Sequence, residues 1–262
     1  MAIQHKFTKS IRRSLAGVFN RVIFMLWMLP AVHLYADTPL PFSASYEARY
    51  GGFRASAERS LERIDDTHIE IRTLLQLKLL GRSVSSIRES SDVFIDSNDG
   101  QARSTDYSFI QTGIGKRSRH IQFDWDAAIA RASLDNLKLE LPLESNATDN
   151  LSSYLEIRRQ LQEGHQEIIF PGIYKGELED IHYRVVGEEI ADTTLGKFNS
   201  IRLKRIREPN SDRNTEIWLA KEWDYMLIKL VQEEPGNSTI SLELKEAVMN
   251  GTPVTAESPG SQ

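Results

Sequence analysis

Hydrophobic and polar residues alternate with a period of two along most of the chain. In residues 42–50, FSASYEARY, Phe42, Ala44 and Tyr46 share one face of an extended strand, and serine, glutamate and arginine occupy the other. This alternation is typical of a β-strand that buries one face and exposes the other. It recurs in eight further segments: residues 67–81, 116–125, 137–143, 181–187, 197–208, 215–220, 225–234 and 239–249.

Turn-forming residues separate these segments. Gly51-Gly52 indicates a hairpin turn, and Pro235-Gly236-Asn237 indicates another. Residues 112–118, TGIGKRS, superficially resemble a phosphate-binding loop, but they lie between two strands and no helix follows them. The segment therefore predicts a glycine-rich hairpin. Its basic residues either bind an anion or lie in solvent: Lys116, Arg117 and Arg119.

One central segment has helical spacing instead. Four apolar residues fall on one helical face: Leu151, Tyr154, Leu155 and Leu161. Asp149 is a suitable N-cap residue for this helix, and Gly164 is a suitable residue to end it. The pattern predicts an all-β, mainly antiparallel fold, a strongly curved sheet or open barrel meander with one inserted helix near 150–163. The helix either covers an open sheet edge or fills the concave side.

The N-terminal 36 residues have the pattern of a cleaved secretory signal. Five basic residues and no acidic ones precede the end of the apolar run at residues 22–32, and a small residue, Ala36, suits cleavage. A retained anchor is the alternative, but the run is shorter than the roughly 20 residues of a membrane span. We therefore expect a periplasmic protein without a stable transmembrane helix after cleavage, with one β-rich domain at 37–249 and a disordered tail at 250–262.

Charge and cysteine content narrow the classes of function. Beyond residue 36 the chain retains 27 basic and 37 acidic residues, a formal net charge of −10. Such a chain is a poor nucleic-acid binder, because phosphate contacts need a basic surface. The absence of cysteine excludes disulfides, thiolate metal sites, cysteine nucleophiles and lipid attachment through an N-terminal cysteine.

No set of residues in the sequence declares a reaction, a metal site or a cofactor. The four histidines beyond residue 36 are isolated, and none shares ligand spacing with another: His68, His120, His165 and His182. Asp124 and Asp126 share a face only if the strand continues past Trp125, whereas Asp126 suits a turn. We expect Trp125 and Trp218 to be buried and Trp223, nearer a turn, to be exposed. These aromatic residues either fill a dry core or line an apolar ligand cavity.

Several runs together resemble a known family over about residues 40–247. In order they are FSASYEARYGGFRASAE, SIRESSDVF, HIQFDWD, TDNLSSYLEIRRQL, VVGEEIADTTLGKFNSIRLKR and TEIWLAKEWDYMLIKLVQEE. The chain resembles exported proteobacterial proteins catalogued only as a domain of unknown function. The resemblance implies a bacterial periplasmic β-rich fold and no activity. Its most specific elements are residues 123–125, the helix start at Asp149, Gly187-Glu188 followed by Gly196, and residues 217–220. Five signature positions have no assigned role: Phe123, Asp124, Trp125, Glu188 and Trp218. Leu227 follows Tyr225-Met226 where relatives often carry proline.

Three functional hypotheses remain at this point, beside a purely structural role. The first is a non-enzymatic binding or chaperone-like protein of the cell envelope, with a lipid, an acyl chain or an envelope protein as its partner. One reason for this hypothesis is that the predicted architecture resembles that of envelope proteins whose curved sheet wraps a helix and shelters acyl chains. The second is an enzyme acting on envelope glycans through Asp124 and Glu188 or Glu189. The third is an outer-membrane β-barrel.

Overall fold

A computed structural model describes residues 38–50, 53–79, 82–96, 99–236 and 238–256. The expected signal segment, residues 1–36, and the expected Gly51-Gly52 turn lie outside the described residues. The described chain is all-β with one α-helix, as the alternation predicts. Its strands are β1 Phe42–Tyr50, β2 Phe53–Arg63, β3 His68–Leu79, β4 Arg82–Ile95, β5 Ala102–Gly113, β6 Arg117–Asp124, β7 Ile129–Leu134, β8 Leu137–Pro142, β9 Glu167–Tyr174, β10 Glu177–Asp192, β11 Lys197–Ile206, β12 Asn214–Ala220, β13 Met226–Glu234, β14 Ser238–Met249 and β15 Thr252–Pro253. The helices are α2 Ser153–Gln162 and the short 3-10 helix η2 Lys221–Trp223.

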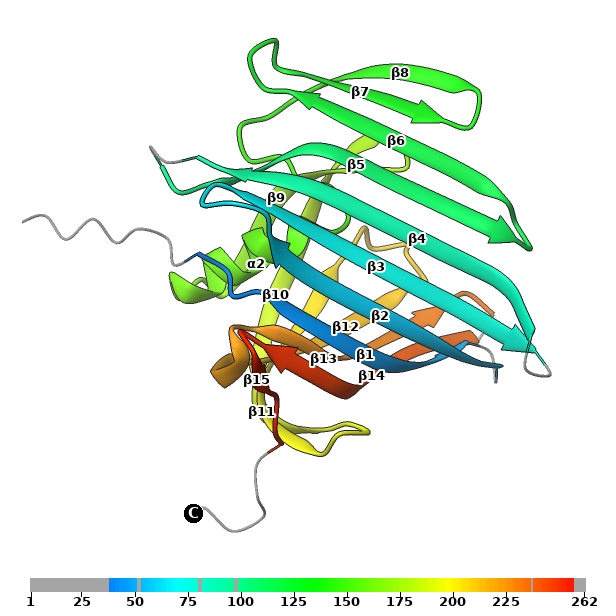
Figure 1. Cartoon of the computed structure of the whole chain (residues 1–262), viewed down its shortest axis with the longest axis vertical. Coiled ribbons are helices and arrows are strands. Elements are labelled where there is room, and N and C mark those ends of the chain that lie inside the picture. The colour runs from blue at the N-terminus through cyan, green and yellow to red at the C-terminus, as the bar shows by residue number, and fades with distance from the viewer. Residues whose placement is uncertain (1–37, 51–52, 80–81, 97–98, 237, 257–262) are drawn as a thin grey trace, which may run out of the picture. The chain divides into compact units, whose positions relative to one another are not determined.

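The strands form one antiparallel sheet of 15 strands in the order β8-β7-β6-β5-β4-β3-β2-β1-β14-β13-β12-β11-β10-β9, with β15 paired to β14. The N-terminal and C-terminal halves therefore join through the β1–β14 pair, in which Phe42 lies opposite Met249. Figure 1 shows the broad wall made by β1 to β6, with α2 behind it. Strongly twisted sheets of this size curl rather than stay flat.

The two ends of the sheet approach each other without pairing into a closed barrel. A Cβ atom added to Gly176, in the turn between β9 and β10, would lie 2.4 Å from Leu134 Cδ1 of β7. Thr148, which follows β8, forms an isolated bridge with Gly172 of β9. The sheet is thus an open barrel, and the segment before α2 lies in the gap between its ends.

Antiparallel pairing places the turns at two opposite ends of this open barrel. The C-terminal ends of β1, β3, β5, β7, β9, β11 and β13 lie at one end, which we call the rim. The other end, which we call the helix end, contains α2, η2 and the remaining turns. Residues 112–118 form the β5–β6 hairpin at the rim, so the predicted glycine-rich hairpin is confirmed.

The helix fills the concave side of the sheet rather than covering an edge from outside. Ile157 and Leu161 pack in a cluster with inward residues of β9 to β12, including Phe170 and Leu203. Tyr154 packs in the larger core cluster, where its ring meets Phe42 edge-on at 6.0 Å between centroids. Since α2 contacts both walls, it closes the helix end of the barrel.

Asp149 does not cap α2 directly, so the expected N-cap is wrong by three residues. Ser152 is the N-cap, and Asp149 organises the turn before it. Asp149 Oδ1 accepts the backbone N–H groups of Leu151 and Ser152 at 2.7 and 2.9 Å. Its Oδ2 accepts the hydroxyls of Ser91 on β4 and Ser104 on β5 at 2.5 and 2.6 Å. This buried carboxylate therefore fastens the helix start to the β4–β5 wall.

Two boundaries differ from the sequence-based expectation. The strand expected at 181–187 extends over Glu177–Asp192, because a bulge at Gly187 shifts the β10–β11 register and lets pairing continue. The loss of regular structure expected from residue 250 is wrong for its first residues. Thr252–Pro253 forms β15 on β14, and Val254 is buried.

Candidate functional site

Two of the family-signature residues, Phe123 of β6 and the half-buried Trp125 that follows it, pack in the core. Phe123 is buried, and its ring stacks on that of Trp125 at 6.2 Å between centroids. The Trp125 indole N–H donates to the backbone oxygen of Ser104 at 2.7 Å. This bond anchors the end of β6 to β5. Their expected inward placement is confirmed, and they act as packing residues in the fold.

The carboxylates that the sequence offered for catalysis are engaged separately. Asp124 accepts the Ala127 backbone N–H at 3.0 Å and an Arg131 N–H at 2.9 Å, and these bonds, the backbone one first, lower the pKa of its carboxyl. Glu188, on β10, pairs with Lys221 at 2.6 Å. Each carboxylate therefore has its own cation, Arg131 of β7 for Asp124 and Lys221 of η2 for Glu188.

Two further tryptophans have different surroundings. Trp218 is buried, and its indole N–H donates to Glu189 Oε1 at 2.7 Å. Trp223, expected to be exposed, is half-buried against the main core. It lies in η2, where the chain crosses the helix end between β12 and β13.

The histidines lie on the surface, each beside an acidic residue. His68 lies 3.0 Å from Asp65, His120 lies 2.6 Å from Asp106, and His182 lies 2.5 Å from Glu167. Within the described ranges, no three side chains of the His, Asp and Glu type gather closely enough to hold a metal ion. The same part of the chain contains no helix of the length and apolarity needed to cross a membrane.

A partly open cavity of about 550 Å³ lies between the two walls of the open barrel. Such a volume lies in the usual range of ligand pockets. Its apolar surface comes from α2 and from inward residues of β9, β10, β12 and β13: Ile157, Ile173, Ile181, Ile217, Leu219, Leu227 and Leu230. The five signature positions lie outside its lining.

One wall of the cavity carries a polar row on β2, β3 and β4. Arg59, Thr73 and Glu89 are cross-strand neighbours on the inward face. Glu89 Oε2 accepts the Tyr107 hydroxyl at 3.0 Å and the Asn150 side-chain amide at 2.6 Å. Burial raises the pKa of the Glu89 carboxyl in spite of these two bonds.

The opposite wall carries three arginines near the rim. Arg205 is the penultimate residue of β11, Arg207 follows its last residue, and Arg213 precedes β12. Arg205 pairs with Glu179 at 3.3 Å, and Arg213 pairs with Glu234 at 2.7 Å. Among the described residues Arg207 has no hydrogen bond or ion pair. Burial, followed by the nearby Arg205 charge, lowers the pKa of the Arg207 guanidinium.

Unpartnered buried donors gather on this cavity. Four of its lining residues carry a buried polar atom without a hydrogen-bond partner: Arg59 Nε, Thr73 Oγ1, Arg205 Nε and Arg207 Nη1. Such groups are uncommon in folded proteins, because each costs its lost hydration. A cavity that collects them is therefore suited to a ligand that supplies hydrogen-bond acceptors.

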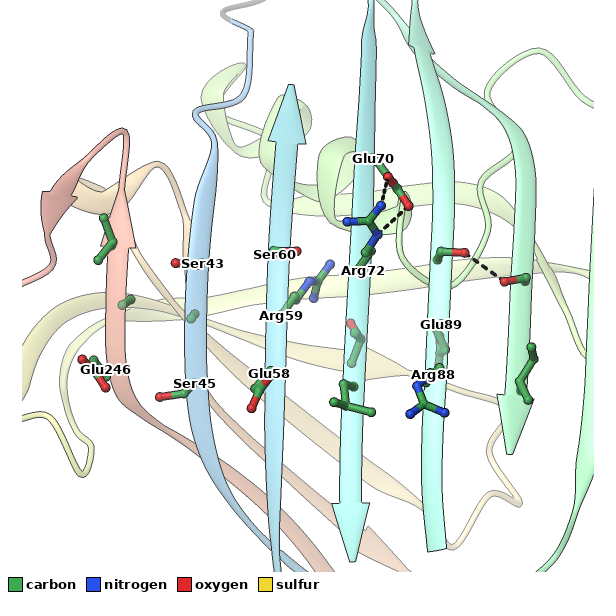
Figure 2. A pocket seen from close by; sticks show the side chains of 18 residues that line it. Ser43, Ser45, Glu58, Arg59, Ser60, Glu70, Arg72, Arg88, Glu89 and Glu246 are labelled. Carbon is green, nitrogen blue, oxygen red and sulfur yellow. Dashed lines mark hydrogen bonds and ion pairs between the residues drawn. The ribbon is translucent and has the colours of Figure 1, made fainter. Parts of the chain in front are cut away.

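A second hollow, of about 670 Å³, lies on the outward face of β14 and β1 to β5. Figure 2 shows the polar residues along it, including Ser43, Ser60 and the Arg72 guanidinium held by Glu70. Arg72 donates twice to the Glu70 carboxylate, at 2.6 and 2.5 Å. Arg59, Thr73 and Glu89 border both hollows, but Arg59 turns inward over the Tyr154 ring at 5.2 Å. In the outer groove Arg72 is already paired with Glu70, and no unpartnered buried donor faces outward there among the described residues.

The fold defines a β-barrel-like protein, and comparison with solved structures agrees. A beta-barrel-like protein from Brucella abortus, with the domain of unknown function DUF1849, is similar over 80% of this chain and 98% of that chain. Its TM-score is 0.53 at 8% identity, which shows the fold alone. A protein from Parabacteroides distasonis is similar over 80% of this chain and 95% of that chain, with 9% identity and a TM-score of 0.34.

The chain itself belongs to the family described as protein of unknown function (DUF3108), which matches residues 45–245. The resemblance to a family known only as a domain of unknown function is therefore confirmed. No curated protein matches the chain.

Sequence reasoning missed the arginine cluster. Residues 197–208 were recognised as a strand, and the period of two that puts Leu203 inward also puts Arg205 and Arg207 inward. The sequence signal that could have revealed the cluster is an arginine at the next inward positions after an apolar stripe. Arg213 lies beside these two arginines only because the chain turns back between β11 and β12.

Proposed function

We propose that this chain is a non-enzymatic binding protein of the bacterial cell envelope that holds an amphiphilic ligand with an acyl chain. The N-terminal segment directs its export and is cleaved after Ala36, so the protein acts in the periplasm. The observation that carries the proposal is the cavity between the two walls of the open barrel, which joins an apolar surface to buried donors without partners.

The apolar side chains of this cavity stabilise an acyl chain through burial of its methylene groups, at about 0.8 kcal/mol for each. Polar atoms at a cavity wall fix the orientation of such a ligand. A cavity closed at one end by α2 suits a flexible chain better than a folded protein partner. We therefore favour a lipid or acyl ligand over an envelope protein.

The structural features support this function over its two alternatives. The carboxylates considered for glycan hydrolysis, Asp124 and Glu188, form separate ion pairs on β6 and β10. The outward face of β1 to β4 carries polar and charged side chains such as Ser43, Glu58 and Arg72. An outer-membrane barrel presents an apolar band there instead.

Ligand binding can be tested on protein purified from the periplasm. We expect native mass spectra to contain a bound amphiphile, and cis-parinaric acid to gain fluorescence on binding. Leu230→Trp fills the apolar part of the cavity and should abolish the fluorescence gain. Ile190→Trp places the same side chain at an exposed position and should leave it intact. A bare protein in native spectra that also fails to bind the probe contradicts the proposal.

Export can be tested separately by fractionation and by the N-terminus of the purified protein. We expect the full-length gene product to accumulate in the periplasmic fraction with Asp37 as its first residue. Recovery in the cytoplasmic fraction with an intact N-terminus would contradict the proposed location.

A further inference from the structure

We infer that Arg205, Arg207 and Arg213 hold a monoanionic head group, with the acyl chain of the same ligand lying deeper in the cavity. This inference rests on the proposed function and names the ligand class: an amphiphile whose head group is a sulfate ester, a phosphodiester or a carboxylate. These groups share one negative charge and at least two acceptor oxygens.

The charge of the cluster matches a monoanion. Glu179 offsets the charge of Arg205, and Glu234 offsets that of Arg213. Arg207 forms no ion pair of its own; the charges of Arg205 and Arg213 act against its charge, and Glu179, already paired with Arg205, acts in its favour. The three arginines with these two carboxylates therefore carry one net positive charge. Arg207 is half-buried with its Nη1 shielded from solvent, so its charge loses part of its hydration, and a bound anion compensates for that loss.

The hydrogen-bonding capacity of the cluster also fits such a head group. Arg205 Nε and Arg207 Nη1 are buried donors without acceptors. A guanidinium is planar and presents its N–H groups in a fork that matches two oxygens of one anion. The Arg205 guanidinium lies 5.9 Å from the centroid of the Tyr183 ring, which helps to hold its orientation.

The cavity becomes less polar from the rim toward the helix end. Alternate residues of β12 and its preceding turn line it in the order Arg213, Thr215, Ile217 and Leu219. On the facing strand β13, Gln232 lies near the rim, and Leu230 and Leu227 follow toward the helix end. This order places a charged head at the rim and an apolar chain toward α2.

Three small probes separate head-group recognition from chain burial. Sodium decyl sulfate, 1-decanol and inorganic sulfate are each added, below any micelle concentration, to delipidated mature protein, and thermal melting and isothermal titration are recorded. We expect decyl sulfate to bind roughly 10- to 100-fold more tightly than decanol, since hydrogen bonds to charged groups contribute that much. Inorganic sulfate alone should bind far more weakly than decyl sulfate.

Two arginine variants and one control identify the residue that is responsible. Arg207→Met should remove most of the preference for decyl sulfate over decanol, while Arg207→Lys keeps the charge and should retain part of it. The ligand-free Arg207→Met variant should melt at a higher temperature than the wild type, because a half-buried charge without an ion-pair partner is gone. A merely structural arginine would give the opposite change in melting temperature. Lys204→Met, at the exposed neighbouring position on β11, should alter neither binding nor preference.

The outcomes are distinguishable. Equal binding of decanol and decyl sulfate overturns the head-group inference and leaves the proposed acyl-binding function standing. Binding of neither decyl compound, together with no parinaric acid signal, overturns both. Inorganic sulfate that binds as tightly as decyl sulfate also overturns the inference, because the cluster would then be a site for a free anion.

Discussion

Arg158 Nε of α2 donates to Asp224 Oδ1 at 2.6 Å, and the two side chains are only 4% and 8% exposed. Asp224 Oδ2 accepts the backbone N–H of Leu40 at 3.0 Å, and the Asp224 carbonyl accepts the Tyr154 hydroxyl at 2.9 Å. One aspartate after η2 therefore joins the helix, the β12–β13 connection and the segment before β1. These contacts fix the closed end of the cavity.

Removal of one partner of this buried pair should strongly destabilise the protein. Arg158→Met leaves Asp224 buried without its cation, and we expect a loss of about 3–5 kcal/mol in the free energy of unfolding. The Arg158→Met/Asp224→Asn double variant should lose less than the sum of the two single variants. Urea titration measures each value. Arg131→Met, which breaks the exposed pair with Asp124, is the control and should change stability very little.

Asp149 should be equally important for attaching α2. Asp149→Ala removes the acceptor of two backbone N–H groups and two serine hydroxyls, so we expect a loss on the order of 3 kcal/mol. Asp126→Ala, at an exposed turn position, should stay within about 0.5 kcal/mol of the wild type. Equal unfolding midpoints for the two variants would show that the Asp149 contacts contribute nothing net.

Glu89 should make stability depend on pH. Burial raises the pKa of its carboxyl above the ordinary value of 4.5, so the folded state binds a proton that the unfolded state has released. Stability should therefore fall as the pH rises from 4.5 through the folded-state pKa, and the loss is complete above it. Arg59 favours the charged form and Asp149 opposes it.

Glu89→Gln retains an acceptor for Tyr107 and Asn150 but cannot ionise. We expect this variant to be more stable than the wild type at pH 7 and to match it below pH 4.5. Urea titrations from pH 4 to pH 8 measure this difference. A stability difference that stays constant over this range would refute the role assigned to Glu89 ionisation.

Two glycines with similar positive φ angles should differ in their tolerance of alanine. Gly113 has φ +78° and Gly164 has φ +82°. An added Cβ at Gly113 would lie 2.1 Å from the backbone oxygen of Val84, whereas nothing lies within 4 Å at Gly164. Gly164→Ala should cost about 1–2 kcal/mol from left-handed strain alone. Gly113→Ala should cost at least about 2 kcal/mol more, because the β4–β5 backbone must shift. Similar thermal unfolding of both variants would contradict this.

The local parts of the fold were predictable because their signals are local. The period of two in residues 42–50 determines which side chains point inward, whatever the neighbouring strand is. The helical spacing after Asp149 likewise predicts an amphipathic helix, and two glycines between strands predict the β5–β6 hairpin. The strand expected at 181–187 was too short because a glycine in the sequence can mark either a turn or a β-bulge. In the structure Gly187 lies at a bulge, and the strand continues past it.

The candidate site could not be predicted in the same way. Arg207 and Thr73 are far apart in the sequence, and only the curling of the sheet brings their strands to one cavity. Asp149 showed a capping signal, but its serine partners, Ser91 and Ser104, come from two other strands. Whether an inward polar atom finds an acceptor depends on the opposite wall, which the sequence does not specify.

The sequence by itself thus determined the all-β class, the inward stripes and the single helix, because these follow from residue spacing along one chain. Only the tertiary structure decided that the barrel stays open, that α2 closes one end, and that unpartnered arginine donors face an apolar hollow. Those features depend on contacts between residues distant in sequence, where the sheet's twist and curl determine which side chains meet.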